Sequence, residues 1–301
     1  MGGVGPGMPE LRAQRHKILP ATVAKSTHIY AHQPTETGPL ALEVDIYTPV
    51  TTRRCPLLIW LHSGGFWRGT RRNRNHQQLA VILAQHGYAS AFPDYRLSKD
   101  RALLGPAAQS ALAWLTLEAE QTNGDLPATL RGPVSIAAME DAALFLQWID
   151  QQRDRFVLNR AIVLGGSSAG AITALNTLLL APALGIPQPQ IRCVLSISGA
   201  FAYPSVVRAA TAPIFALHSP LDRQVPIASI RRLKLVNPEM VTLLELPELS
   251  HGWPMVERSE TLQTAVGRLI AFDQTIAGWH RQAAISRQNL APGNPEASGP
   301  E

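Results

Sequence analysis

The chain has few charged residues, few aromatic residues and no long apolar run. Of its 301 residues, 16% are charged, 6% are aromatic and 46% are hydrophobic, which is typical of a globular protein. No stretch of 18 consecutive apolar residues occurs, so no membrane span is predicted. The first residues lack both a basic segment and an apolar core, so we expect no secretory signal and a cytoplasmic location.

Cysteine is also scarce, since only Cys55 and Cys193 are present. Each lies in or beside a predicted buried strand, and one more strand is expected between those two. Strands two places apart are separated by about 9–10 Å, beyond the roughly 7 Å between Cα atoms that a disulfide tolerates. We therefore predict two free, buried thiols. The two cysteines and nine histidines show no metal-ligand spacing, so neither a metal site nor a cofactor is predicted.

The net charge of +5 is partly local, because Arg68, Arg71, Arg72 and Arg74 lie close together. Such a cluster either steers anionic partners or forms a solvated loop, and the second interpretation is favoured. The chain has no basic surface interleaved with aromatic residues, so no nucleic-acid partner is predicted. The oligomeric state cannot be predicted from the sequence.

Short apolar runs alternate with helical patterns along most of the chain. Two alternating segments, 27–31 and 41–47, flank a turn-rich stretch and predict an antiparallel hairpin. The other predicted strands lie at 56–61, 88–92, 161–164, 194–198, 213–218 and 241–246. Helical patterns between them predict an α/β fold with a mostly parallel, eight-stranded sheet and helices on both faces.

The composition also predicts the limits of the folded domain. Residues 1–24 are rich in Gly and Pro and are expected to form a loose arm, whereas 25–281 form one domain. Residues 98–134 interrupt the regular order, which predicts an insertion after the fourth strand that lies over the strand ends. Residues 282–301 are polar, contain Pro and Gly and show no periodicity, so we expect a disordered tail.

One serine lies between a predicted strand and a predicted helix, in the pattern Gly166-x-Ser168-x-Gly170. This pattern is typical of a serine exposed on a sharp turn, where the glycines let the helix approach the strand. Two alternatives stay open. Ser168 is an ordinary helix N-cap, or Ser167 is the exposed serine in a register one residue earlier.

Two further polar residues follow later strands, Asp222 after 213–218 and His251 after 241–246. Ligands of such a sheet bind beyond the carboxyl ends of its strands, and the order Ser, Asp, His is the one found in hydrolases of this architecture. His251 would take the proton of Ser168, and Asp222 would fix the imidazole tautomer.

These two assignments also have alternatives. Asp222 either serves this site or caps the turn before Pro226, and His251 is otherwise a surface residue. The nearby acids Glu245 and Glu248 occur later in the chain than expected for the acidic residue of a Ser, Asp, His triad.

A reaction that develops an oxyanion needs preorganised backbone donors. The N–H of Ala169, at a helix N-terminus, is one candidate. Gly64 and Gly65 follow a buried strand and can bring further N–H groups close, because only hydrogen projects from their Cα atoms.

Several other residues near the predicted strand ends have two interpretations. His62 and His218 are interpreted as structural, and Asp94 with Arg96 as an ion pair that fixes loops. Three aromatic residues near these strand ends either line a substrate pocket or simply pack against other residues: Phe66, Trp67 and Trp253.

On these residues the chain resembles the α/β-hydrolase superfamily, and within it the hormone-sensitive-lipase-like and feruloyl-esterase-like carboxylesterases. The resemblance covers about 25–280. It rests on His62-Ser63-Gly64-Gly65-Phe66-Trp67, Asp94-Tyr95-Arg96-Leu97, Gly166-Ser167-Ser168-Ala169-Gly170, His218-Ser219-Pro220-Leu221-Asp222 with Val225-Pro226, and His251-Gly252.

The resemblance implies the α/β-hydrolase fold and an oxyanion hole formed by Gly64, Gly65 and Ala169. It also implies a serine esterase that acts on small to medium carboxylic esters through an acyl-enzyme. The rival functions are an arylformamidase or amidase with the same triad, which an aromatic pair at 66–67 would suit, and a non-catalytic ligand-binding homologue.

This chain departs from the family pattern in two ways. Ser63 replaces the first glycine of the usual His-Gly-Gly-Gly, so its side chain would narrow the acyl site or add a hydrogen bond. Ser168 and Asp222 are only 54 positions apart, because the extra material lies at 98–134 instead. Substrate preference is therefore not transferred from the relatives.

Overall fold

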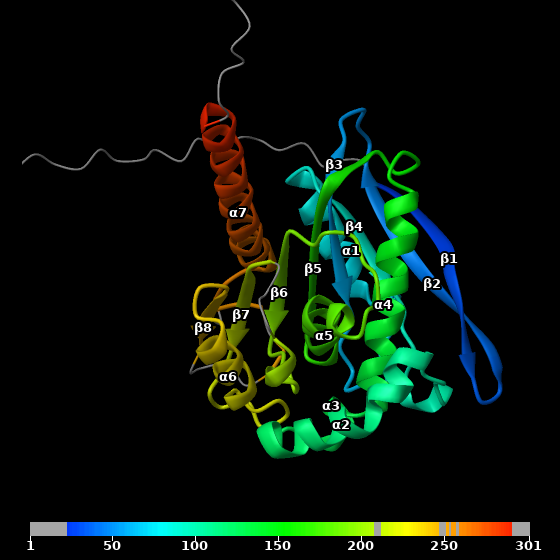
Figure 1. Cartoon of the computed structure of the whole chain (residues 1–301). Helices are drawn as coiled ribbons and strands as arrows, with labels where there is room; N and C mark the ends of the chain where they lie inside the picture. Colours follow the sequence, from blue (N-terminus) through cyan, green and yellow to red (C-terminus); the bar gives the residue numbers. More distant parts are fainter. Residues whose placement is uncertain (1–22, 208–211, 247–250, 253, 257–258, 291–301) are drawn as a thin grey trace, which may run out of the picture.

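A computed structural model describes residues 23–207, 212–246, 251–252, 254–256 and 259–290, with side chains up to residue 278. Its centre is an eight-stranded sheet with the order β1-β2-β4-β3-β5-β6-β7-β8 (Figure 1). The strands are β1 (Val23–Thr35), β2 (Gly38–Pro49), β3 (Cys55–Leu61), β4 (Ala89–Pro93), β5 (Leu158–Ser167), β6 (Cys193–Ile197), β7 (Ile214–His218) and β8 (Val241–Glu245).

The predicted opening hairpin is confirmed, since β1 and β2 pair antiparallel and β2 then pairs antiparallel with β4. All further pairs, from β4–β3 to β7–β8, are parallel. The predicted mostly parallel α/β sheet is therefore confirmed. Because β5 lies between β3 and β6, Cys55 and Cys193 lie two strands apart, and both are buried and free as expected.

Helices cover both faces of the sheet. One face carries α1 and α7, and the other carries α4, α5 and α6 (Figure 1). Their bounds are α1 (Arg74–Gln85), α4 (Pro133–Gln151), α5 (Ala169–Ala183), α6 (Ala228–Val236) and α7 (Leu262–Leu290). The central strands therefore bury both of their faces. In β5, Ile162 and Leu164 pack with α4 and α5, whereas Val163 packs toward α1 and α7.

The insertion at 98–134 contains a short 3₁₀ turn, η1 (Ser98–Asp100), and the helices α2 (Pro106–Asn123) and α3 (Ala128–Arg131). These helices lie at the end of the molecule where the parallel strands have their carboxyl ends (Figure 1). Thr122 and Asn123 both donate hydrogen bonds to the carbonyl of Ala202, which follows β6. The insertion therefore reaches the edge of the sheet where a ligand is expected.

Two expected boundaries are wrong. Val23 and Ala24 belong to the sheet, because they pair with Pro49 and Thr48. Residues 1–22 of the predicted arm lie outside the described residues. At the other end α7 continues to Leu290, so the predicted disorder is wrong for 282–290. This stretch lacks Pro and Gly and contains Ala, Arg and Gln, which favour helix even without an apolar stripe; residues 291–301 lie outside the described part.

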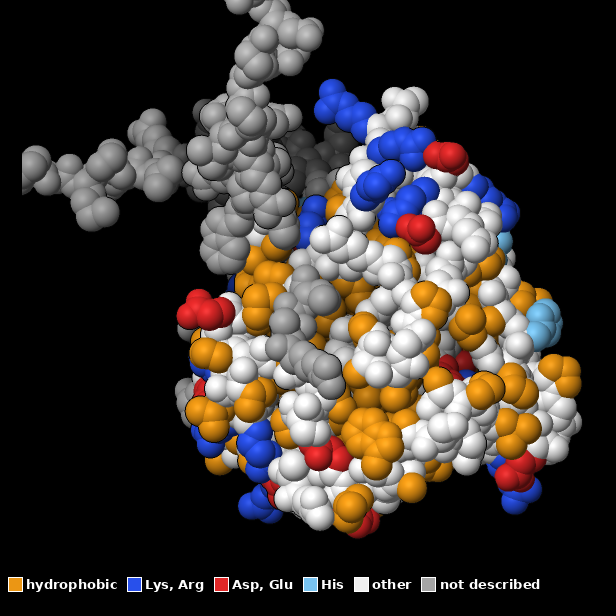
Figure 2. Space-filling view, viewed as in Figure 1, with side chains coloured by type: hydrophobic (Ala, Val, Ile, Leu, Met, Phe, Trp, Pro, Cys, Tyr) orange, Lys and Arg blue, Asp and Glu red, His pale blue; other side chains and the backbone are white. Residues whose placement is uncertain are grey.

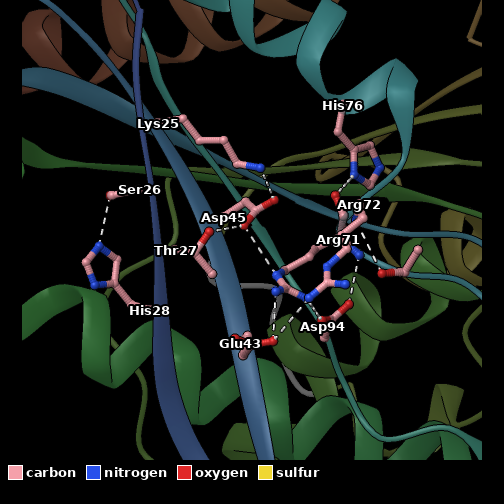
Figure 3. A network of polar contacts seen from close by, with 11 residues as sticks. Lys25, Ser26, Thr27, His28, Glu43, Asp45, Arg71, Arg72, His76 and Asp94 are labelled. Carbon is pink, nitrogen blue, oxygen red and sulfur yellow. Dashed lines mark hydrogen bonds and ion pairs between the residues drawn. The ribbon is translucent and has the colours of Figure 1, made fainter.

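The prediction of a solvated arginine loop is wrong for Arg71, which is only 5% exposed. Its guanidinium donates to Glu43 at 2.7 Å, to Asp94 at 2.7 Å and to Asp45 at 3.3 Å (Figure 3). The carboxylates come from β2 and from the end of β4. The network therefore ties the loop after β3 to the sheet.

The predicted pairing of Asp94 with Arg96 is also wrong, because each residue has another partner. Asp94 accepts from Arg71, whereas the fully buried Arg96 donates to Asp141 of α4 at 2.9 Å and also pairs with Glu140. Both residues do fix loops, as expected, but they connect the end of β4 to different elements.

Candidate active site

Ser168 lies on a sharp turn between the last residue of β5 and the first of α5. Its φ of 55° and ψ of −123° are strained for a residue with a side chain. The turn is held because the Ser168 N–H donates to the carbonyl of Ile197, at the end of β6, over 2.8 Å. This geometry presents the hydroxyl at the edge of the sheet, as the sequence pattern predicts.

The two glycines of the pattern are required by a close approach of chain segments. A Cβ atom on Gly170 would lie 2.1 Å from the carbonyl oxygen of Leu61 on β3. A Cβ atom on Gly166 would lie 2.6 Å from the backbone carbon of Gly170. Helix α5 can therefore pack directly against β3 and β5 only because neither residue has a side chain.

Three side chains from distant parts of the chain meet at this turn. The Nε2 atom of His251 lies 2.9 Å from Oγ of Ser168. On the other side of the ring, Nδ1 of His251 lies 2.7 Å from Oδ2 of Asp222. Ser168 makes no hydrogen bond as a helix cap, so the structure favours its predicted place in this group over the N-cap alternative.

Asp222 has both of its predicted roles, as a cap of the loop after β7 and as a partner of His251. Its Oδ1 accepts from the backbone N–H groups of Gln224 and Val225, at 2.9 Å and 3.0 Å, and so caps the loop after β7. Its Oδ2 remains for His251. Of the alternative acids, Glu245 pairs instead with Arg231, and Glu248 lies outside the described residues.

The surroundings of Asp222 keep its carboxylate ionised. Burial alone would raise its pKa, but hydrogen bonds from His218, from His251 and from two backbone N–H groups outweigh burial and hold the pKa well below its usual range. His218 lies at the end of β7, with Nε2 2.8 Å from the carbonyl of Val225 and 3.4 Å from Asp222. His218 therefore holds the loop that contains Asp222, in agreement with its predicted structural role.

The loop after β3 lies beside the Ser168 turn, because Leu61 pairs with Gly166 across the sheet. Gly64 and Gly65 have φ of 130° and 61°, and the carbonyl of Gly64 accepts from Trp67 and Arg68 in a tight turn. Ala169 begins α5. The three predicted donor residues thus lie on two adjoining segments at one edge of the sheet.

His62 anchors the start of this loop. Its carbonyl accepts from the hydroxyl of Tyr95 at 2.6 Å, and its ring stacks on the Tyr95 ring with centroids 4.1 Å apart. Its Nδ1 lies 2.9 Å from the carbonyl of Ser63. The predicted structural interpretation of His62 fits these contacts.

The predicted pocket residues that the structure describes differ in their surroundings. Phe66 is 1% exposed and packs against Tyr95 in the core, so its assignment to the pocket is wrong. Trp67 is 60% exposed, with the guanidinium of Arg68 4.7 Å from its ring centroid. Ser63 does line a cavity of about 330 Å³. Trp253 lies outside the described residues.

Ser198 is a further residue of the site that was not predicted from the sequence; it follows β6 and has a φ of 51°. Its Oγ accepts from the N–H of Gly252 at 2.9 Å, so it holds the residue after His251. Its position at the carboxyl end of the predicted strand 194–198 could have indicated that it belongs to the site. Wall residues of the cavity were also missed, because an apolar residue of a helix or strand has the same pattern whether it lines a cavity or fills the core.

The surface around this edge is apolar. Figure 2 shows apolar side chains over α2 and toward the centre of the view, whereas Lys and Arg gather beyond the opposite ends of the strands. Trp114 and Leu117 of α2 are among the exposed apolar residues. Among the described residues, no group of three or more His, Cys, Asp or Glu is arranged to hold a metal ion, and no helix has the length and apolarity needed to cross a membrane.

Two family profiles match separate parts of the chain. One, described as BD-FAE, matches residues 44–128, and the other, described as phospholipase/carboxylesterase, matches residues 136–256. No curated protein sequence matches the chain significantly.

Solved structures of esterases are similar over most of the chain. Esterase 2 of Thermogutta terrifontis, phosphorylated by paraoxon, has a TM-score of 0.58 and 17% sequence identity, covering 89% of this chain and 96% of its own. An esterase structure from Rhizomucor miehei has a TM-score of 0.59 and 16% identity, covering 87% of both chains. Together the matches support a hydrolytic, ester-cleaving enzyme. The chain therefore has the α/β-hydrolase fold, and part of it is similar to the phospholipase/carboxylesterase family.

Proposed function

We propose that this protein is a serine carboxylesterase that hydrolyses small to medium esters through an acyl-enzyme. The observation that carries the proposal is the continuous chain of hydrogen-bonding contacts from Ser168 through His251 to the ionised Asp222. A serine hydroxyl is a weak nucleophile, and a base at 2.9 Å is within reach of its proton.

The reaction then takes place in two steps. Oγ of Ser168 attacks the ester carbonyl carbon as Nε2 of His251 takes its proton, and the collapse of the tetrahedral intermediate returns that proton to the departing alcohol. Water, deprotonated by the same nitrogen, next attacks the acyl-serine, which releases the carboxylic acid and restores the hydroxyl. Asp222 holds the Nδ1–H and stabilises the imidazolium in both steps.

Backbone N–H groups of Ala169, Gly64 and Gly65 are the proposed donors to the oxyanion. Ala169 is favoured because it is the first residue of α5, where N–H groups have no partner within the helix. The glycine loop is fixed by Tyr95 and by the Arg71 network, so its N–H groups are held in place before the reaction begins.

The insertion helices α2 and α3 are proposed to form part of the roof, since they lie at the carboxyl edge. Helix α2 donates to the carbonyl of Ala202, and the carbonyl of Arg131 in α3 accepts from the hydroxyl of Tyr203. Deletion of residues 106–131, which removes both helices, would then change the relative rates on different esters. An unchanged substrate preference in a folded deletion variant would contradict the roof.

The rival functions are less well supported. The aromatic pair that favoured an arylformamidase is separated, because Phe66 is buried and Trp67 is exposed. A non-catalytic binding protein would not need the His251 ring to contact both Ser168 and Asp222. The cytoplasmic location stays a prediction.

The test is the hydrolysis of p-nitrophenyl acetate by the purified chain. We expect Ser168→Ala to lower kcat/KM by at least about a thousandfold while the protein stays folded. The matched control is Ser205→Ala at an exposed serine, which should leave activity unchanged. Full activity of folded Ser168→Ala would refute the proposed mechanism.

A further inference from the structure

A cavity of about 330 Å³ lies between α1 and α7, on the face of the sheet opposite α4 and α5. This volume falls within the range of small-ligand pockets. Apolar residues from β3, α1, α7 and the segment after His251 form most of its wall. Among them are Trp60, Leu79, Met255, Leu262, Val266 and Leu269.

The cavity opens beside the candidate active site. Three of its wall residues are the immediate neighbours of site residues. Ser63 precedes Gly64, Ser167 precedes Ser168, and Gly252 follows His251; all three line the cavity. A group bound to Ser168 therefore has this space next to it.

The wall is polar at its exposed rim and mostly apolar inside, where His76 is a buried polar residue. Asn73, Asn75 and Gln78 at the start of α1 are exposed, whereas Leu79 and Val266 are buried. The described wall residues include no Lys, Arg, Asp or Glu. An uncharged apolar chain fits such a lining, because a charged group inside it would have no partner.

The floor of the cavity depends on a glycine. A Cβ atom on Gly165 would lie 3.0 Å from the ring of Trp60, so the absence of a side chain lets the Trp60 ring lie across β5. Trp60 is only half-buried and lines the cavity. It offers a flat apolar surface to a bound chain.

We propose that this cavity is the acyl pocket of the site and that the preferred substrates are esters with an apolar acyl chain of medium length, such as hexanoyl. The inference rests on the proposed function, since the acyl group is the part of an ester that stays attached to Ser168 after the alcohol leaves. With its carbonyl oxygen at the proposed donors of Gly64 and Ala169, the acyl chain would enter the cavity between Ser63 and Ser167, which both line it.

The first test compares p-nitrophenyl acetate, butyrate and hexanoate. Burial of a methylene is worth about fourfold in kcat/KM, so the wild-type protein should prefer hexanoate to acetate by at least about tenfold. Leu262→Trp fills the cavity, so it should remove this preference and change the acetate rate by less than about twofold. The matched control is Leu235→Trp on α6, where Leu235 is 81% exposed, and it should leave both rates unchanged.

A second filling variant, Val266→Phe, repeats the test should Leu262→Trp fail to fold. An equal loss on acetate and hexanoate, or a hexanoate preference that survives in both variants, would overturn the proposal. Acetate esters of longer alcohols, which have a short acyl group and a long alcohol group, show which of the two groups occupies the cavity. If filling the cavity impaired only those substrates, the acyl assignment would be wrong.

A binding measurement separates this inference from the proposed function. Titration of the full-length Ser168→Ala protein with sodium hexanoate and sodium acetate needs no turnover. We expect hexanoate to bind at least about tenfold more tightly, and Leu262→Trp to abolish the difference. If esters were hydrolysed but hexanoate bound no better than acetate, the acyl-pocket assignment would be wrong and the proposed esterase function would stand. If hexanoate bound selectively but no ester was hydrolysed, the proposed function would be wrong and the binding of an apolar chain in the cavity would stand.

Discussion

The imidazole of His251 lies 2.9 Å from the hydroxyl of Ser168, although the two residues are 83 positions apart in the chain. The ring is held on its other side by Asp222 at 2.7 Å. Loops after β5, β7 and β8 place the three groups at one edge of the sheet. The parallel arrangement of these strands thus creates the site.

Replacement of Asp222 by Asn should leave a folded protein with little activity. The amide cannot stabilise the imidazolium or enforce the same tautomer, so we expect kcat on p-nitrophenyl acetate to fall by about 10³–10⁴-fold. The matched control is Asp154→Asn, at a solvent-exposed aspartate far from the site. Retention of more than about a tenth of the activity in Asp222→Asn would contradict the assigned role.

The same substitution should alter the pH dependence of stability. The folded-state pKa of Asp222 is lower than that of the unfolded chain, so its ionised form stabilises the fold above about pH 4, and this contribution disappears as the pH falls through the folded-state value. The difference in the free energy of unfolding between wild type and Asp222→Asn should therefore shrink between pH 6 and pH 3. Urea titrations measure it, and a difference independent of pH would be the contrary result.

The sequence predicts those parts of the fold that depend on local pattern. Buried strands are short apolar runs, and polar residues follow their carboxyl ends, so Ser168, Asp222 and His251 are predicted from the glycine–serine pattern, their order and their positions. The glycines at 166 and 170 are equally visible, because their requirement comes from a backbone turn. This explains why the strands and the three central side chains are predicted together, whereas the order of the strands in the sheet was not predicted.

Features that depend on tertiary partners are not visible in the same way. Arg71 is one of four clustered arginines, and only its place beside Glu43, Asp45 and Asp94 distinguishes it. Phe66 looks like a pocket residue because it follows the glycines, but a φ of 64° at this residue accompanies its burial in the core. Sequence pattern contains no information on such turns of the chain.

Arg71 should be far more important for stability than its neighbour Arg72. Arg71→Met removes the shared partner of the buried Asp45, the half-buried Asp94 and the partly exposed Glu43, so we expect a loss of about 1–3 kcal/mol in the free energy of unfolding. Arg72→Met should cost less than about 0.5 kcal/mol, because Arg72 is 72% exposed. Chemical denaturation of both variants checks this, and equal losses would show that the network does not stabilise the fold.

Gly170→Ala should destabilise the protein, because its Cβ atom would lie 2.1 Å from a backbone oxygen of β3 that cannot move independently. We expect a cost of at least about 1–3 kcal/mol in the free energy of unfolding. Gly267→Ala, within α7, is the control, since nothing lies within 4 Å of the added atom. Gly170→Ala with wild-type stability would mean that α5 does not pack this closely.

The two cysteines should be unreactive in the folded protein. Both thiols are buried, and burial raises the pKa of each, most strongly that of Cys193 beside Asp273. A thiol reagent at pH 8 should therefore label neither residue in the native state and both in denaturant. Rapid labelling of the native protein would contradict the predicted packing of β3 and β6.

The central claim is that Ser168 is the nucleophile, and covalent labelling tests it most directly. A fluorophosphonate reacts with a serine only when a neighbouring base activates it. Mass spectrometry of the labelled chain should show one adduct, on the peptide fragment ion that isolates Ser168 from Ser167, and none in Ser168→Ala. Absence of an adduct on the folded wild-type protein, or an adduct on Ser167, would contradict the account.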